Sequence, residues 1–449
     1  MRHARLRIPA RAGAVVLAAA GLLLCVLAGT APADERPTVL VTDPRASAYR
    51  AAVQRFREAG PSPDPVRPGR FRAALVRALE FSGVFEILDP ASYLGGQETG
   101  ALTGRPACEP WRAIRADALV AGEIRALPTG LEVEFRTLDV GRCRPFPGRV
   151  YRGGTGDELR IARRIADDVV EFFTGVRGVA STEIAYVASS GSAREIHVMD
   201  ADGGNPRAAT RNRSINNFPD WAPDGRSIVY SSYREAGSPA LFLLTRGRPS
   251  PGRILRGLGV GPIYRGVFDP GGRRLALVVG GADGSEIYTV GRDGRALRRL
   301  TRNRAIEVSP SWSPDGRHLA FVSDRAGSPQ IYLMDQDGRR VRRLTFEGSY
   351  NTDPAWSPDG RWIAYQRRVG TGFDIWITDP EGRVNVPVVD HPRSDEAPSW
   401  SPDSRKLVFA SNRRGSYDLY AVNLDGRGLV RLTRDPGDET APDWGPYPE

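Results

Sequence analysis

Polar side chains recur in the second half of the chain at a fixed distance before an aromatic residue. Six equivalent positions lie five residues ahead of a Trp or Phe: Asn216, Ile263, Glu307, Asn351, Asp395 and Glu439. If the copies surround a common axis, these side chains form a partly acidic collar at one opening. Converging carboxylates concentrate an electric field, so the collar could bind a partner or a cation such as calcium. Solvated loop residues are the alternative.

The histidines of this region offer little material for catalysis. His197 in "EIHVMD" takes a position that is aromatic in other copies, which indicates a packing role. His318 occupies a variable position, and His391 lies in the loop "VVDHPRS". The sequence contains neither the Gly-x-Ser-x-Gly pattern of a nucleophile elbow nor a Cys-x-x-Cys pair. We therefore expect no enzyme and no metal site, with a hydrolase or a ligand-binding sensor as the alternatives.

The elements that must position these residues are given by a repeat. "PSWSPDGRHLAF" at 310–321 returns as "PAWSPDGRWIAY" and "PSWSPDSRKLVF", and an earlier copy reads "PDWAPDGRSIVY". The inner aromatic falls at intervals of 47 once and then 44 four times, at these positions: Trp221, Phe268, Trp312, Trp356, Trp400 and Trp444. A period in the low forties is typical of a β-propeller blade. Asp-Gly makes the tight turn between the buried strand and the returning strand.

The ends of the repeat region predict how the circle closes. Residues 184–210 contain the outer hairpins of a blade without a preceding Trp strand, and only five residues follow Trp444. Joining the two ends gives a six-bladed propeller over 184–449, in which no sheet edge is left at the junction.

Residues 34–175 have a different pattern, which predicts an α/β domain followed by a linker at 176–183. Strands are expected at "TVLVT", "VFEIL", "ADALVAGEI" and "LEVEFRTLDV", and helices at "RASAYRAAVQRFR" (45–57), 70–83 and 156–175. Gly83 and Gly175 stand where helix-ending glycines belong. The expected apolar face of the last helix consists of Leu159, Ala162, Ala166, Val169, Val170 and Phe173.

The first 33 residues read as a secretory signal peptide. A basic start, "MRHARLRIPAR", precedes an apolar run, and Ala31 and Ala33 form the small-residue pattern of a cleavage site. An uncleaved signal anchor is the alternative. Cleavage would lower the formal net charge from +10 to +6, and the remaining Arg residues are scattered, which argues against nucleic-acid binding. We expect an exported protein, and the family resemblance described below implies the periplasm.

Two cysteines, Cys108 and Cys143, remain after that cleavage. An even pair in an oxidising compartment is a candidate disulfide that would close a long loop. Two buried free thiols are the alternative.

The chain resembles the TolB family of the Tol–Pal cell-envelope system. The repeats alone are common to many propellers, and the specific matches are "LRIARRIADDVVEFFTGVRGVASTEIAYVA", "ALEFSGVFEILDP" and "ADALVAGEI". With the repeats, the resemblance covers essentially the whole mature chain. It departs from the family at Phe268, which replaces Trp, and in "DPRASAYRAAVQRFREAG", and the cysteine pair is not part of the pattern.

The resemblance implies a monomeric adaptor without enzymatic activity. Members bind the peptidoglycan-associated lipoprotein Pal through the loops that lead into the inner strands, here "GVGPIYRGVF" and "RAIEVSPSW". The candidate contact residues are Pro262, Arg265, Glu307 and Val308, surrounded by the collar. The mature N-terminal segment would bind TolA, and its candidate residues are Asp34, Glu35, Arg36, Pro37, Thr38 and Val39. Other outer-membrane lipoproteins or porins are further candidate partners.

Overall fold

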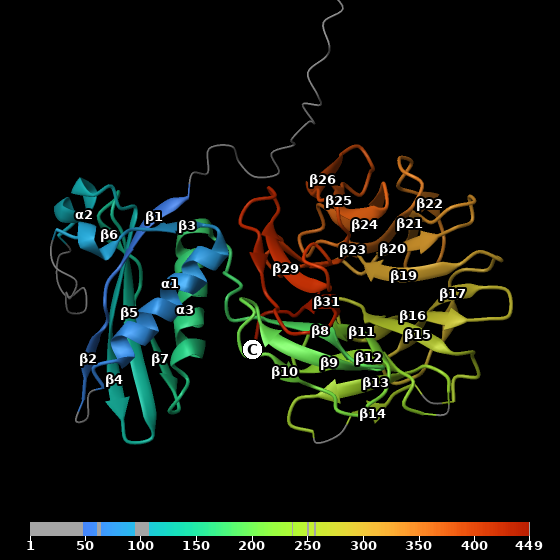
Figure 1. The fold of residues 1–449 in the computed structure, drawn as a ribbon, viewed down its shortest axis with the longest axis horizontal. Coiled ribbons are helices and arrows are strands. Elements are labelled where there is room, and N and C mark those ends of the chain that lie inside the picture. The colour runs from blue at the N-terminus through green and yellow to red at the C-terminus, as the bar shows by residue number, and fades with distance from the viewer. Residues whose placement is uncertain are drawn as a thin grey trace, which may run out of the picture. The chain divides into compact units, whose positions relative to one another are not determined.

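The computed structural model describes residues 48–60, 64–94, 107–235, 237–248, 251–255 and 257–448. Residues 184 onward form six four-stranded antiparallel sheets arranged as a propeller (Figure 1). The prediction of an α/β region followed by a six-bladed propeller is confirmed. The signal peptide, the strand expected at 38–42 and the segment expected to bind TolA lie outside the described residues.

Five blades are continuous in sequence, and each runs outward from its inner strand. Blade 1 contains β11 (Asn216–Trp221), β12 (Ser227–Ser232), β13 (Ala240–Thr245) and β14 (Gly252–Arg253). Blade 2 contains β15 (Ile263–Phe268), β16 (Arg274–Gly280), β17 (Ser285–Gly291) and β18 (Arg298–Arg299). Blade 3 contains β19 (Glu307–Trp312), β20 (His318–Ser323), β21 (Gln330–Asp335) and β22 (Arg342–Arg343). Blade 4 contains β23 (Asn351–Trp356), β24 (Ile363–Val369), β25 (Gly372–Thr378) and β26 (Asn385–Val389). Blade 5 contains β27 (Asp395–Trp400), β28 (Lys406–Ser411), β29 (Asp418–Asn423) and β30 (Val430–Arg431).

Blade 6 joins the two ends of the propeller in one sheet. Its inner strand is β31 (Glu439–Trp444), and its outer strands are β8 (Glu183–Ser190), β9 (Ala193–Asp200) and β10 (Arg207–Ala208). Glu439 pairs with Ala188, and Trp444 pairs with Ile184. Because β31 and β8 hydrogen-bond each other, neither leaves an unpaired edge at the junction.

The turn after each inner strand follows from its sequence. Gly225, Gly272, Gly316 and Gly360 have φ of 62–77°, a conformation that glycine adopts without a steric penalty. In blade 5 the same position is Ser404, which adopts φ 59°. Its Oγ accepts a hydrogen bond from the Asp359 N–H in blade 4, so the turn also ties two blades together.

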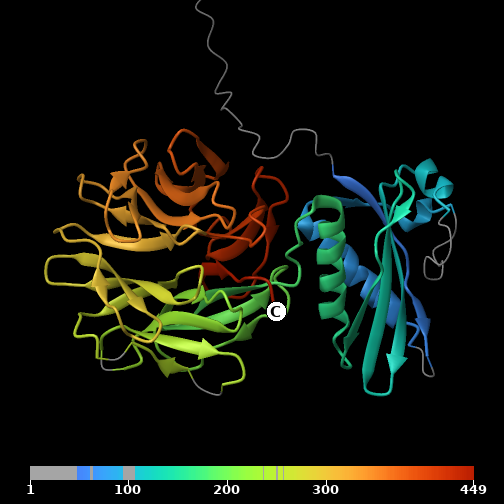
Figure 2. The ribbon, with the colours of Figure 1, turned by 180° about the vertical axis from the view of Figure 1, so that it is seen from behind.

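The N-terminal region forms a seven-stranded mixed sheet with two long helices. The strands are β1 (Tyr49–Val53), β2 (Arg57–Ala59), β3 (Phe85–Ile87), β4 (Ala118–Leu127), β5 (Gly130–Asp139), β6 (Arg144–Pro145) and β7 (Arg149–Gly153). The helices are α1 (Arg67–Ser82), α2 (Glu109–Ala113) and α3 (Glu158–Thr174), with a 3₁₀ turn at Pro90–Ser92. Helices α1 and α3 lie side by side on one face of the sheet (Figure 2) and share its apolar core.

The helix expected at 45–57 is wrong. Tyr49–Val53 forms β1, which pairs in parallel with both β3 and β4. Ala51, Ala52 and Val53 are fully buried there, so pairing on both sides outweighs the helical propensity of the alanines. The predicted face of α3 also needs a correction: Leu159 is exposed, and Ile161 and Ile165 are buried.

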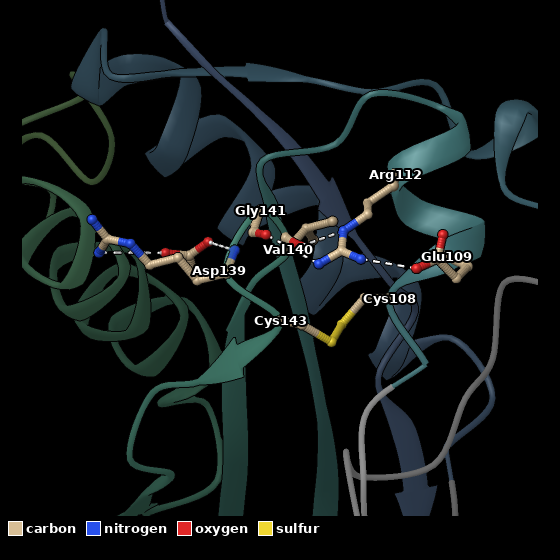
Figure 3. Close-up of a disulfide and its surroundings, with 8 residues drawn as sticks. Cys108, Glu109, Arg112, Asp139, Val140, Gly141 and Cys143 are labelled. Atoms are coloured by element: carbon tan, nitrogen blue, oxygen red, sulfur yellow. Dashed lines mark hydrogen bonds and ion pairs between the residues drawn. A yellow bond between two sulfur atoms is a disulfide. The ribbon is translucent and has the colours of Figure 1, made fainter.

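A disulfide joins Cys108 to Cys143, with 5.8 Å between the Cα atoms (Figure 3). It connects the start of α2 to the turn after β5. Arg112 ties the same two segments, because its Nε donates to the Val140 carbonyl at 3.1 Å and its Nη2 to the Gly141 carbonyl at 3.0 Å. The short α2 is thus held by a covalent bond, by the Arg112 guanidinium and by the buried Trp111, which packs in an apolar cluster with Leu119 and Leu138.

We expect the Cys108→Ser, Cys143→Ser double variant to lower the stability of the N-terminal region. Cutting a bond that spans 35 residues increases the entropy of the unfolded chain, which costs about 4 kcal/mol. Urea unfolding followed by circular dichroism would measure this cost. An unchanged midpoint would show that the noncovalent contacts of Arg112 and Trp111 are enough to hold α2 in place.

Candidate functional site

The inner strands enclose a cavity of about 320 Å³ at the propeller axis, and all six blades contribute to its lining. We call the edge at which the inner strands begin the mouth edge. The third residue of an inner strand lines the cavity in five blades, at these positions: Phe218, Arg265, Asp353, Ala397 and Ala441. These residues, and not the first residues of the strands, face the opening.

An irregularity in the inner strands directs these residues. In every blade except the second, the pairing register shifts between the second and fifth residues of the strand. The third residue has φ of 45–53° in these blades, although none is glycine: Phe218, Ser309, Asp353, Ala397 and Ala441. Such bulges bend a strand, and a left-handed non-glycine residue is strained. The same strained conformation therefore surrounds the opening in five blades.

Arg265 of blade 2 spans the opening. Its Nη1 lies 3.3 Å from Oδ1 of Asp353 in blade 4, and its guanidinium lies 5.3 Å from the centre of the Phe218 ring in blade 1. The Ser309 hydroxyl of blade 3 donates to the same Asp353 oxygen at 2.8 Å. We call these four residues, Phe218, Arg265, Ser309 and Asp353, the mouth clasp.

Carboxylates deeper in the channel tie neighbouring blades together. Asp220 accepts a hydrogen bond from the Phe268 N–H at 2.9 Å, and Asp443 accepts one from the Trp221 N–H at 2.7 Å. Burial raises the pKa of Asp443 to about 6, against the lowering effect of its hydrogen bonds and of Arg265. Burial, followed by the charge of Asp443, raises the pKa of Asp220 well above its usual value. The sequence analysis did not find this pair, although both residues immediately precede an inner-strand Trp.

The expected collar is wrong as an exposed surface. Its six members are only 0–7 % exposed: Asn216, Ile263, Glu307, Asn351, Asp395 and Glu439. They begin the inner strands, as the repeat predicts, but the polar side chains point into the gaps between strands and bond there. Because these residues are inaccessible at the surface, they are not contacts for a partner in this structure, and calcium binding stays a prediction.

The buried acids of this ring are paired with arginine in two blades. Arg325 contacts both oxygens of Glu307, at 2.9 and 3.0 Å, and Arg413 contacts Asp395 at 2.8 Å. In blade 6 the position equivalent to these arginines is Ser190. Glu439 therefore has no such cation, and its Oε2 is buried without a hydrogen-bond partner. Burial, and then the neighbouring Asp418, Asp435 and Asp438, raise the pKa of Glu439 to about 7.

Comparison with known proteins identifies this architecture. Residues 170–448 match the family described as "TolB beta propeller domain", and residues 37–145 match "TolB amino-terminal domain". The Tol-Pal system protein TolB of Anaeromyxobacter dehalogenans is 37% identical over 298 residues, which cover 66% of this chain and 67% of that protein. The chain belongs to the TolB family.

Further relatives agree with this assignment. TolB of Bordetella pertussis is 34% identical over 295 residues, covering 65% of this chain and 64% of that protein. The crystal structure of TolB from Acinetobacter baumannii superposes with a TM-score of 0.77 at 25% identity, covering 89% of this chain and 97% of that one. The resemblance found in the sequence is confirmed.

The candidate contact residues of this TolB-family chain differ in their accessibility. Pro262, Arg265 and Val308 are half-buried at the mouth edge, whereas Glu307 is fully buried and paired with Arg325. Tyr264, beside Arg265, is exposed and was not expected as a contact. The sequence could have indicated Tyr264, because it is an aromatic residue within the segment "GVGPIYRGVF" that supplied the other candidates.

No residue constellation for catalysis is evident among the described parts of the chain. His197 lies opposite Tyr186 in neighbouring strands, with 5.6 Å between the ring centres, which fits the expected packing role. His318 is exposed.

The described residues contain no group of three or more His, Cys, Asp or Glu placed to hold a metal ion. Within the same residues, no helix is long and apolar enough to cross a bilayer.

We expect Glu439→Gln to stabilise the propeller at alkaline pH. Glu439 stays protonated in the folded state up to about pH 7, whereas it ionises near pH 4.3 when unfolded. The wild type therefore loses stability as pH rises from about 4.5 to 7, and the amide does not. The variant should melt higher than the wild type at pH 8 and at about the same temperature at pH 4.5.

Glu307→Gln is the matched control, because it replaces a fully buried carboxylate that is paired with Arg325 and so leaves that guanidinium beside a neutral group. This variant should melt lower than the wild type at both pH values. A Glu439→Gln variant that melts lower than the wild type at pH 8 would show that the Glu439 carboxylate is favourable in the fold.

Proposed function

We propose that this protein is a non-enzymatic periplasmic adaptor of the Tol–Pal system. In this proposal the mouth edge binds the lipoprotein Pal, and the segment Asp34–Thr42 binds TolA. The adaptor supports outer-membrane integrity and the constriction of the envelope at cell division. The family assignment supports a role in the Tol–Pal system.

The mouth clasp is the observation that carries the Pal proposal. It places a half-buried guanidinium, a carboxylate and an aromatic ring from three blades within one small area. Exposed Tyr264 is the second residue of β15, and exposed Ile306 immediately precedes β19. Arginine and aromatic residues are enriched among the side chains that dominate binding energy at protein interfaces.

The strained backbone of the inner strands supports the same conclusion. Five left-handed non-glycine residues surround one opening, and such strain persists where the surrounding structure holds it for a function. A rigid edge of this kind loses little entropy on binding, which favours affinity for a folded partner. An adaptor needs this rigidity but needs no catalytic group.

We expect Arg265→Glu to abolish tight binding to the soluble domain of the same organism's Pal. The substitution places two carboxylates against each other in the mouth clasp and reverses the charge offered to the partner, so a loss of about 100-fold is expected. Isothermal titration calorimetry of the mature protein measures it. Arg317→Glu, at an exposed turn on the opposite edge, is the control and should bind like the wild type.

The reversed pair Arg265→Glu, Asp353→Arg separates two roles of Arg265. If Arg265 contacts Pal directly, the reversed pair still fails to bind. If Arg265 only arranges the mouth clasp, the reversed pair restores binding. A folded wild type that does not bind Pal would refute the proposal.

The TolA contact is tested by deleting Asp34–Thr42 from the mature protein. We expect the deletion to abolish binding to the periplasmic domain of TolA and to leave its melting temperature within about 2 °C of the intact chain, because chain termini usually contribute little to stability. Pull-down and calorimetry would measure the two effects. Undiminished TolA binding would place the site elsewhere on the chain.

A further inference from the structure

Blade 4 carries a cluster of rings and guanidinium at the mouth edge. Tyr350 immediately precedes β23, Arg368 lies near the end of β24, and Phe373 lies opposite Arg368 in β25. The two rings meet edge to face, with 5.7 Å between their centres. The Arg368 guanidinium lies 4.6 Å from the centre of the Tyr350 ring and 5.4 Å from that of Phe373. We call these three residues the blade 4 triad.

The other blades show that the fold does not require this triad. The backbone is alike at this place in the other blades. In blade 4 the Arg368 N–H donates a hydrogen bond to the Tyr350 carbonyl. The same backbone hydrogen bond joins Tyr233 to Ile215 in blade 1 and Gly280 to Pro262 in blade 2. The side chains at the three equivalent positions differ. Blade 2 has Pro262, Gly280 and Ser285, blade 3 has Ile306, Asp324 and Pro329, and blade 5 has Ser394, Asn412 and Tyr417. The equivalent positions in these blades have no arginine held between two rings.

The surroundings of the triad are apolar and basic. Phe346, in the loop before β23, is 73% exposed, and its ring lies 5.1 Å from the Arg343 guanidinium. Val369 beside the triad is also exposed. The acid Glu347 is engaged by Arg367 at 3.2 Å, whereas exposed Arg368 has no ion pair among the described residues. The loop before β23 and the end of β24 thus carry exposed apolar side chains, and Arg368 adds a positive charge that no acid among the described residues pairs with.

Stacking determines what Arg368 can bind. The guanidinium contacts both rings through cation–π interactions, and none of its N–H groups takes part in an ion pair among the described residues. Two of these N–H groups match the two oxygens of a carboxylate. Because the rings hold the side chain in place, little rotamer entropy remains to be lost on binding.

We propose that the blade 4 triad is a second contact surface for Pal, which receives an Asp or Glu of the lipoprotein on Arg368 and an apolar side chain beside Phe346. The inference rests on the proposed function, since the triad lies on the same edge as the mouth clasp and the same partner has to reach both. A sugar is the less suitable occupant, because the rings are inclined at 68° and Arg368 covers their faces.

The test is calorimetric titration of Pal into the mature protein and its Arg368→Glu variant. We expect the variant to bind Pal about tenfold more weakly than the wild type. Raising the salt concentration should weaken Pal binding less in the variant than in the wild type, because the variant lacks the attraction that salt screens. Arg368→Lys keeps the positive charge without the planar guanidinium, so its affinity for Pal should lie between those of the wild type and Arg368→Glu. Arg414→Glu is the matched control, because Arg414 is exposed near the same edge of blade 5, and it should change affinity by less than about threefold.

Melting temperatures establish that each variant is folded. Should Arg368→Glu melt early, Arg368→Gln removes the charge without adding repulsion and carries the same expectation. If Pal binds the wild type and Arg368→Glu equally well, or if Arg414→Glu weakens binding as much, the triad is not a contact and the mouth clasp alone remains. If Pal does not bind the wild type, the proposed function fails and this inference fails with it.

Discussion

The pairing of β31 with β8 is the constraint on which the rest of the propeller depends. It joins Trp444, near the C-terminal end, to Ile184, at the start of the repeat region, so the six sheets must form a closed circle. In a closed circle each inner strand has a fixed neighbour on both sides. The Trp221 N–H donates a hydrogen bond to Asp443 across the boundary between blade 1 and blade 6. These two blades contain the first and the last inner strand in the sequence, respectively. Closure thus fixes the blade spacing and with it the width of the channel.

Arginines of the same blade explain why charged side chains can be buried where the inner strands begin. Glu307 and Asp395 are inaccessible to water and would be costly alone, but Arg325 and Arg413 compensate them. Each pair anchors the loop that leads into an inner strand. The mouth edge built on these anchors is rigid, which suits it to present Arg265, Asp353 and the blade 4 triad in fixed positions.

The repeat made most of the propeller predictable, because a Trp every 44 residues followed by a turn sequence leaves few other architectures. It also placed the first residue of every inner strand correctly. The exposure of those residues was not predictable, since it depends on the bulge two residues later. That bulge directs the third residue of the strand toward the channel, as at Phe218 and Asp353. The first residues of the same strands, Asn216 and Asn351, are fully buried. A regular strand pattern gives no sign of such a shift in register.

The sequence by itself determined the fold class, the number of blades and the closure of the circle, because these follow from periodicity and from local turn chemistry. It also indicated the family, because specific segments outside the repeats resemble it. Only the tertiary structure decided which polar residues face the channel, that Arg265 reaches from blade 2 to Asp353 in blade 4, and that Tyr49–Val53 is a strand and not a helix. Each of these depends on contacts between residues far apart in the chain. Burial and pairing at such contacts outweigh local propensity, and no sequence period reports them.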